Sequence, residues 1–331
     1  MPQWTMVQAI HNALALELER DPRVLICGED VGLNGGVFRV TDGLQARFGA
    51  KRVFDTPLAE SGIVGTALGM AVYGLKPVVE IQFAGFSFVA FNQIASQITR
   101  LRSRSGGIFT APIVMRAPFG GGVRTPELHS DSMEGFFMQM PGIKVVIPAT
   151  PYDAKGLLHA AIASPDPVLI LEHMKLYRSL RQEVPETHYT APIGQAAVVQ
   201  EGADATLIAY GAMVQVAQQA AQIVRAESAA NGENISLEII DLRTIAPLDE
   251  ETIAASVTKT GRAVILHEAP RAGGVAAEVI AVINERSLYA LLKPVERVTC
   301  PDMPFPVPSV EDQFIPNAER VAAAIRRVLA P

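Results

Sequence analysis

Cysteine is scarce in this sequence. Only Cys27 and Cys300 occur among 331 residues, and neither stands in a CxxC spacing. A disulfide framework or a structural zinc site is therefore not expected, whereas a reducing compartment is. Basic residues are sparse as well: the net charge is −6, and the densest basic run, residues 100–104, holds three arginines. A nucleic-acid-binding protein normally has a basic patch or stripe, so the composition argues against that class.

Long apolar runs are absent too. The most apolar region, residues 77–91, is interrupted by Glu80 and Gln82, and it stays short of the roughly 20 residues that a membrane-spanning helix needs. The first ten residues lack a basic segment followed by an apolar core. We therefore expect no signal peptide, no membrane partner and a cytoplasmic location.

Several motifs for nucleotides and metals are missing. The sequence contains no GxxxxGK(S/T) phosphate loop, no GxGxxG after an expected strand and no HExxH. A nicotinamide-dependent oxidoreductase on a doubly wound sheet is one alternative function, and the missing fingerprint argues against it. Tight cofactor binding by the isolated chain would favour that alternative.

The sequence does contain a repeated alternation of short Val/Ile/Leu-rich runs with helical patterns, which indicates parallel sheets covered by helices on both faces. A polar, proline-bearing stretch interrupts the alternation at residues 181–194. We predict an α/β chain of two domains, residues 1–180 and 195–331, joined by the linker 181–194. Strands are expected at residues 24–27, 52–54, 78–81, 113–116, 145–147, 168–171, 205–209, 237–241, 263–268 and 295–300. Helices are expected after Thr5 and at residues 61–73, 88–102, 153–163, 213–226, 250–258, 275–288 and 318–329.

Ligands of open parallel sheets bind beyond the C-terminal ends of the strands. In the first domain, the side chains expected at this edge are Glu29, Glu60, Gln82, Phe86 and His129. They supply two carboxylates, an amide, an aromatic ring and an imidazole. This set could perform acid–base chemistry beside a flat ligand.

Glu60 stands in the run DTPLAESG at the expected start of a helix, and no Lys or Arg occurs between Arg52 and Lys76. Burial disfavours the charged form of a carboxyl group that has no cation beside it. Such a group suits proton transfer to a weakly basic heterocycle. The alternative is a helix-start glutamate that interacts with free backbone N–H groups.

The other candidates have structural alternatives as well. Glu29 is either a second active-site acid or a loop acid beside a turn, and His129 is either a functional or a structural histidine. The glycines of residues 120–122 either admit a cofactor closely or form a mobile loop, and mobility is the favoured interpretation. Three glycines between residues 62 and 69 indicate the close approach of another helix or chain.

Longer runs carry a family resemblance. They include ICGEDVGLNGGVF, RVFDTPLAESGIVG, EIQFAGF, RAPFGGGVRTPELHSDSMEG, KVVIPATPYDAKGLL and EHMKLYRSLRQEVPE. Over nearly the whole chain, they resemble the beta subunit of the thiamine-diphosphate-dependent component of 2-oxoacid dehydrogenase complexes. The last run is most similar to bacterial pyruvate dehydrogenase, with branched-chain 2-oxoacid or acetoin dehydrogenase as the alternative. The resemblance implies a pyrimidine-binding parallel-sheet domain followed by a transketolase C-terminal-like α/β domain.

The resemblance also implies roles for individual residues. Glu60 corresponds to the catalytic glutamate that bonds the aminopyrimidine ring of thiamine diphosphate and favours the tautomer that generates the ylide. His129 corresponds to a catalytic histidine that assists the intermediates and the reductive acylation of a lipoyl group. The cofactor pocket would also include Glu29, Leu58, Gln82 and Phe86.

Partners and ions follow from the same resemblance. Family members form heterotetramers of two alpha and two beta chains, and the alpha chain holds Mg²⁺ and the diphosphate through a GDG motif that is absent here. The dihydrolipoyl acyltransferase component would dock on the C-terminal domain. A structural K⁺ would be held by the backbone carbonyls of Ile113, Ala161, Ser164 and Asp166. A non-catalytic bridging subunit is a further alternative, and the complete motifs around Glu29, Glu60 and His129 argue against it.

Overall fold

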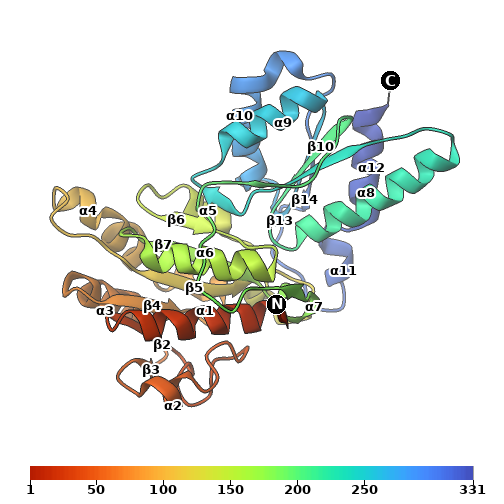
Figure 1. The fold of residues 1–331 in the computed structure, drawn as a ribbon. Helices are drawn as coiled ribbons and strands as arrows, with labels where there is room; N and C mark the ends of the chain where they lie inside the picture. The colour runs from red at the N-terminus through yellow and green to blue at the C-terminus, as the bar shows by residue number, and fades with distance from the viewer. Residues whose placement is uncertain (331) are drawn as a thin grey trace.

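Two sheets organise the chain, and each is covered by helices on both of its faces (Figure 1). The computed structural model describes residues 1–330, of which Glu127 is described by its backbone alone. The first sheet has the strand order β12-β6-β7-β5-β4-β2-β3. The bounds of these strands are Thr244–Ala246, Lys144–Val146, Val168–His173, Val114–Phe119, Lys76–Glu80, Val24–Gly28 and Val53–Asp55. All pair in parallel except β12, which runs antiparallel to β6.

The two faces of the first sheet bury alternate residues of β2. Val24 and Ile26 belong to the core beneath α1 (Met6–Arg20) and α6 (Pro151–Ala163). Leu25 and Cys27 belong to the core beneath α3 (Glu60–Val72). The predicted N-cap of α1 is confirmed: Thr5 and Gln8 form a reciprocal capping box that satisfies free N–H groups of the first turn.

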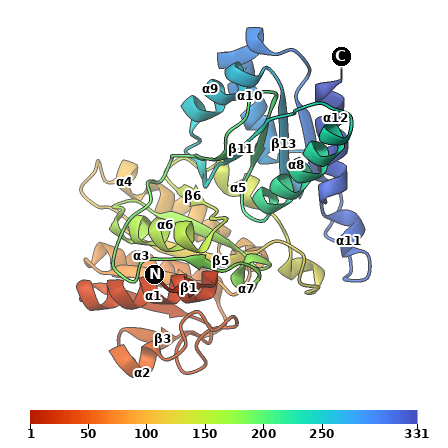
Figure 2. The ribbon, with the colours of Figure 1, turned by 45° about the vertical axis from the view of Figure 1, so that its right-hand side comes forward.

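The second sheet has the order β14-β13-β10-β11-β9, and β9 pairs antiparallel at its edge. Its strands are Glu296–Cys300, Ala263–Pro270, Ala205–Ala209, Leu237–Asp241 and Ala197–Gln200. In Figure 2, α8 and α12 cover one face, and α9 and α10 lie on the other side. These four helices are Met213–Ala230, Ala318–Leu329, Glu250–Thr260 and Val275–Ser287. No helix within residues 1–330 is both long and apolar enough to cross a membrane.

The predicted strands are confirmed to within three residues at each end, and most predicted helices are confirmed as well. The helix predicted at residues 88–102 is confirmed as helical structure from residue 91 onward, but it is not a regular α-helix. This region consists of a 3-10 turn, a π turn, a second 3-10 turn and a short α-helix: η1 (Ala84–Phe88), η2 (Gln93–Gln97), η3 (Ile98–Arg100) and α4 (Leu101–Arg104). Apolar periodicity does not distinguish these hydrogen-bond patterns, because each keeps residues such as Ile94 and Ile98 buried.

The remaining elements are short. They are β1 (Gln3–Trp4), β8 (Gln182–Glu183), α2 (Leu44–Phe48), η4 (Glu127–His129), α5 (Glu134–Met138), α7 (Leu176–Ser179), η5 (Leu288–Ala290) and α11 (Glu311–Phe314). Strand β8 lies in the predicted linker and pairs antiparallel with β1. The linker is therefore packed along the first sheet's domain, as Tyr189 also shows by stacking on Tyr152.

Candidate active site

The strand-end prediction is tested by β3, β2, β4 and β5, which are consecutive in the sheet and parallel. Glu29 directly follows β2, and Glu60 is the first residue of α3, which follows β3. Gln82 lies two residues beyond β4, and His129 ends η4 in the segment after β5. The structure therefore brings these side chains to one edge of the sheet, as the sequence predicts.

Glu29 and Glu60 form a pair of buried acids. Their side chains belong to residues that are 6% and 5% exposed, respectively. Burial, then the negative charges of Glu60 and Asp30, raise the pKa of Glu29. Within residues 1–330, Glu29 Oε1 is buried without a hydrogen-bond partner, and neither acid forms an ion pair. Unpaired acids so close together are typical of functional sites rather than of structural ones.

The position of Glu29 depends on the close approach of β2 to β4 at the preceding residue, Gly28. A Cβ atom at Gly28 would lie 2.5 Å from the carbonyl oxygen of Glu80 in the neighbouring strand. Only glycine allows β2 to pass there and turn toward the edge. Glu60 is set differently, by the start of α3, whose N-cap residue Ala59 offers no side-chain hydrogen bond. No hydrogen bond from the backbone N–H groups of α3 reaches the Glu60 carboxylate in the described chain, so the helix-start alternative receives no support.

His129 lies against two aromatic rings. Its ring centroid is 4.4 Å from that of Phe83 and 5.2 Å from that of Phe86, both in edge-on geometry. Its Nδ1 atom is buried and has no hydrogen-bond partner in the described part of the chain. Gly85 is needed here, because a Cβ atom would lie 2.3 Å from the carbonyl oxygen of Leu128. The aromatic wall therefore fixes the imidazole and leaves one of its nitrogens available.

Two other predicted pocket residues lie between or beside these groups. Gln82 Nε2 donates to Asp30 Oδ2 over 3.3 Å, next to Glu29 in the chain. Leu58 is 79% exposed on the loop that leads into α3. A single exposed leucine is ordinary on a protein surface, so its exposure alone does not indicate a ligand. Phe83 was not predicted, because an apolar residue after a strand has no chemical signature in the sequence.

The glycine loop of residues 120–122 is not free. Gly121 N–H donates to Glu268 Oε2 over 3.0 Å, and Gly122 N–H donates to Glu311, both from the second domain. Glu268 also contacts His173 Nε2 at 2.8 Å. A Cβ atom at Gly120 would lie 2.3 Å from His173 Nε2. The expectation of a mobile loop is therefore wrong. The backbone N–H groups of the loop donate to carboxylates of the second domain, and the missing side chain of Gly120 leaves room for His173.

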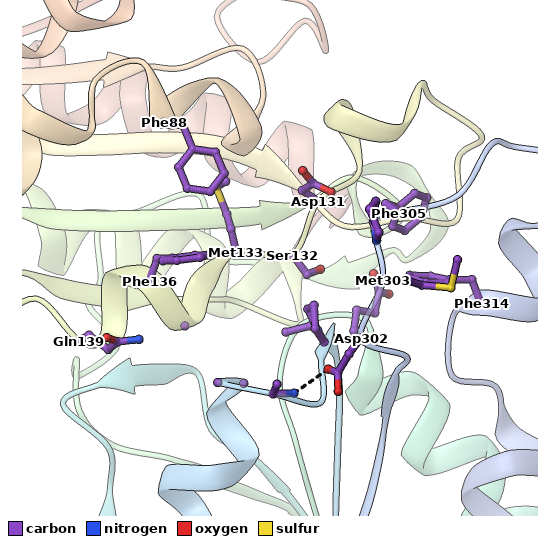
Figure 3. A pocket seen from close by; sticks show the side chains of 18 residues that line it. Phe88, Asp131, Ser132, Met133, Phe136, Gln139, Asp302, Met303, Phe305 and Phe314 are labelled. Atoms are coloured by element: carbon purple, nitrogen blue, oxygen red, sulfur yellow. Dashed lines mark hydrogen bonds between the residues drawn. The ribbon is translucent and has the colours of Figure 1, made fainter.

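A cavity of about 470 Å³ lies between the two domains, beside the segment that follows His129 (Figure 3). Phe88, Met133 and Phe136 face Met303, Phe305 and Phe314 across it, and Asp302 accepts a hydrogen bond from Ala272 N–H over 2.7 Å. Acidic groups, Asp131 and Glu268 among them, are its only charged lining residues within the described chain. Without a cation, this cavity does not suit a diphosphate group.

The four carbonyl groups predicted for a monovalent cation lie at one corner of the first sheet. Ser164 caps the C-terminus of α6, where its N–H donates to the Ala161 carbonyl over 3.1 Å. Ser164 Oγ donates to the Asp166 carbonyl over 2.9 Å, and Val168 N–H donates to the Ile113 carbonyl over 3.0 Å. A helix C-terminus favours a cation. Each carbonyl oxygen keeps a second lone pair, so a cation site here stays a prediction.

Comparison with known proteins defines the class. Residues 3–179 match the family "Transketolase, pyrimidine binding domain", and residues 194–321 match "Transketolase, C-terminal domain". The solved structure of a split-gene transketolase, described as an inactive beta4 tetramer, superimposes with a TM-score of 0.80 over 98% of each chain at 23% identity. At that identity the likeness concerns the fold. The predicted two-domain α/β architecture, a pyrimidine-binding domain followed by a transketolase C-terminal domain, is confirmed.

The relatives narrow this class further. The chain is 55% identical over 329 residues to proteins of Bacillus subtilis and Staphylococcus aureus, with 99% of each chain covered. Both relatives are named pyruvate dehydrogenase E1 component subunit beta. The chain belongs to the family of pyruvate dehydrogenase E1 beta subunits, and the family resemblance predicted from the sequence is confirmed. It is thus one subunit of an enzyme component, and works together with other chains.

Proposed function

We propose that the edge formed by Glu29, Glu60, Gln82 and His129 binds the aminopyrimidine half of thiamine diphosphate. The observation that carries this proposal is the buried pair Glu29 and Glu60, which has no cation in the described chain. A neutral, flat heterocycle with ring nitrogens would satisfy such acids without introducing a further charge. Phe86 and Leu58 supply apolar surface beside it.

The residues present fit this half of the cofactor. Glu29 Oε1 and His129 Nδ1 are buried polar atoms that lack partners in the described chain, and such atoms usually indicate a missing ligand or water. When bound, thiamine diphosphate supplies the electron sink that decarboxylation of a 2-oxoacid requires.

The chain's own residues would divide the work. Glu60 would hold a hydrogen bond to a ring nitrogen and exchange a proton there, and Glu29, whose pKa is raised by burial and by Glu60, would lie beside it as a second acid. Phe83 and Phe86 keep the imidazole of His129 in one orientation. Its buried Nδ1 could then accept or donate a proton at the acyl group that passes to a lipoyl acceptor.

The other half of the cofactor requires an alpha chain. The GDG motif for Mg²⁺ and diphosphate is absent from this sequence, and the interdomain cavity has no cation in its lining. A partner surface is available next to Glu60. Gly62, Thr66, Gly69 and Tyr73 are exposed and fall on one face of α3 and its C-cap. We propose that this face packs against an alpha chain in an α2β2 heterotetramer.

Further parts of the assignment follow from the family. The proposed K⁺ lies at the carbonyls of Ile113, Ala161, Ser164 and Asp166. The dihydrolipoyl acyltransferase component docks on the C-terminal domain. Pyruvate is the proposed 2-oxoacid, because the relatives at 55% identity are named for it. A substrate panel of pyruvate, 2-oxobutyrate, branched-chain 2-oxoacids and acetoin on the reconstituted pair tests this choice.

Replacement of Glu60 by Gln tests the proposed site. The variant keeps the shape of the side chain and removes its proton exchange, so we expect the rate to fall by roughly 10²–10⁴-fold. The assay is reduction of an artificial electron acceptor by the reconstituted alpha and beta chains with thiamine diphosphate, Mg²⁺ and pyruvate.

The matched control is Glu285→Gln, which changes an exposed glutamate of α10 in the second domain. This control should keep full activity. Near-native activity of Glu60→Gln would remove Glu60 from the catalytic site. Normal turnover of the whole complex after replacing both Glu60 and His129 would instead support a bridging subunit without catalytic residues.

A further inference from the structure

A second group of polar side chains lies on the first domain, away from the sheet edge just described. Glu17 belongs to α1, His159 belongs to α6, and His188 belongs to the linker 181–194. One ligand atom of each lies within 4.8 Å of the other two, and this is the one such group of three in the described chain. His159 Nδ1 is 2.5 Å and His188 Nε2 is 3.2 Å from Glu17 Oε1.

Burial and the contact between Glu17 and His159 shift the pKa of both groups. Burial alone would raise the pKa of Glu17, but the hydrogen bond and charge of His159 hold that pKa below its usual range. Burial lowers the pKa of His159, although Glu17 acts in the opposite direction. A metal ion binds the carboxylate form of a glutamate and the neutral form of a histidine.

The burial of His159 places its ligand atom inside the cluster. Its ring is fully buried, and its Nδ1 atom faces Glu17 Oε1. His188 is partly exposed, with 31% of its side chain accessible. The cluster is thus closed on the side of α6 and open on the side of the linker. An ion and a water molecule could enter there.

Two cations lie nearby and set a limit on affinity. Arg20 Nη1 is 3.1 Å from Glu17 Oε1, but half of its side chain is exposed, so it can turn to solvent. Lys155 Nζ is held by Asn12 Oδ1 at 2.6 Å and by the carbonyl of Pro185, and it stays in place. Its charge repels a metal ion. We therefore expect a lower affinity for Zn²⁺ than at a site without these cations.

We propose that Glu17, His159 and His188 bind one Zn²⁺ ion per chain, with water as the fourth ligand, and that this ion fastens the linker to α1 and α6. Two imidazoles and a carboxylate are a ligand set that Zn²⁺ accepts and that Mg²⁺ and Ca²⁺ disfavour. Tetrahedral ligands of Zn²⁺ lie roughly 3.3 Å apart, given bonds of about 2.0–2.1 Å. The Glu17–His188 spacing of 3.2 Å already agrees, and the Glu17–His159 spacing of 2.5 Å would have to widen to this value.

The site is separate from the proposed catalytic residues, so the zinc proposal does not depend on the proposed function. Its expected effect is on the linker. The linker is already held by β8 and by Tyr189, whose hydroxyl donates to the Tyr152 carbonyl over 2.8 Å. Zn²⁺ would add a bond at His188, next to Tyr189. Because Zn²⁺ would bind the folded chain alone, it should raise the unfolding temperature.

Equilibrium dialysis of the full-length chain against ZnCl2 tests the proposal. The native chain should retain one more Zn²⁺ per molecule than His188→Gln, or bind it at least about tenfold more tightly. His188 is accessible to solvent, so its replacement should not prevent folding, which circular dichroism checks. His11→Gln is the matched control, because it removes a histidine outside the cluster and should behave like the native chain.

Co²⁺ gives a second readout through its d–d absorption bands. These bands should appear with the native chain and with His11→Gln, and they should weaken in His188→Gln. Zn²⁺ should also raise the unfolding temperature of the native chain more than that of His188→Gln. Equal metal binding by the native chain and His188→Gln, or equal absorption with Co²⁺, would mean an adventitious ion and would overturn the proposal.

Discussion

Two pairs of buried glutamates lie in or at the edge of the first sheet, and they differ in the charged groups that contact them. Glu80 of β4 and Glu172 of β7 flank Arg116 of β5, which contacts each of them at 2.7 Å. Tyr177 donates a further hydrogen bond to Glu172 over 2.7 Å. Beyond the strand ends, Glu29 and Glu60 are also buried, but no cation of the described chain accompanies them.

This difference separates structural acids from functional ones. In the first pair, hydrogen bonds from Arg116 and Tyr177 replace the water that the glutamates lose on burial. Removal of any of these four side chains would leave a buried polar group without its partner. The second pair leaves its hydrogen-bonding capacity unused, and the fold pays for that in stability. A buried acid is therefore informative only together with its partners.

The strongest test of this comparison removes the cation. Arg116→Met leaves Glu80 and Glu172 buried without a positive charge, and we expect the free energy of unfolding to fall by about 3–5 kcal/mol. Chemical denaturation of the full chain measures the loss. The matched control is Arg286→Met, because Arg286 contacts Glu250 and Glu251 at 2.5 and 2.7 Å on the surface.

The exposed triad should contribute about 0–1 kcal/mol. Similar losses for both arginine variants would break the comparison, since burial would then make no difference to an Arg–Glu–Glu group.

A smaller effect on stability is expected at Asp241, a buried acid that has a backbone hydrogen bond but no ion pair in the described chain. Its Oδ1 accepts the Arg243 backbone N–H over 3.0 Å, while the Arg243 guanidinium contacts Asp153 instead. Burial, then the charge of Asp153, raise the pKa of Asp241 to about 7. The folded chain then binds a proton more tightly than the unfolded chain does. This contribution to stability is present at low pH and is lost as pH rises to about 7.

Asp241→Asn removes that dependence. Relative to the native chain, its free energy of unfolding should increase between pH 5 and pH 8 by on the order of 2 kcal/mol. Asp42→Asn, at an exposed carboxylate, is the control and should show no such trend. A flat difference between Asp241→Asn and the native chain would show that Arg243 compensates Asp241 fully.

The smallest effect on stability is expected at Glu29. Because its folded-state pKa is raised, its ionised form costs stability above the ordinary pKa of glutamate. Glu29→Gln should therefore leave stability unchanged or raise it by at most about 1 kcal/mol near neutral pH, while activity falls. This gain should disappear as pH falls below the usual range of a glutamate. A clear loss of stability would show instead that Glu29 is a structural acid.

The sequence predicts much of the site, because strand ends are visible as the ends of apolar runs. Glu29 and Gln82 follow such runs closely, His129 lies in the segment after β5, and the parallel order brings them together. The sequence does not predict the acids that hold the glycine loop. Glu268 lies 147 residues from Gly121, and no local pattern connects the two.

Periodicity also fails where several geometries bury the same residues. It does not distinguish η2 and η3 from a continuous helix, and it gives no sign that Arg116 lies inside β5 between two glutamates. A charged residue in an apolar run reads as a strand end or as an exposed position. Only the pairing of β4, β5 and β7 shows where its partners come from.

Strand β12 has a consequence for how this chain can be divided. Thr244–Ala246 follow β11 of the second sheet in the chain, yet they complete the border of the first sheet beside β6. A fragment that ends in the linker would leave the N–H and C=O groups of β6 open along that border. Open borders recruit strands from other molecules. The N-terminal fragment expressed alone should therefore self-associate, and supplying residues 195–330 as a separate chain should restore a dispersed product.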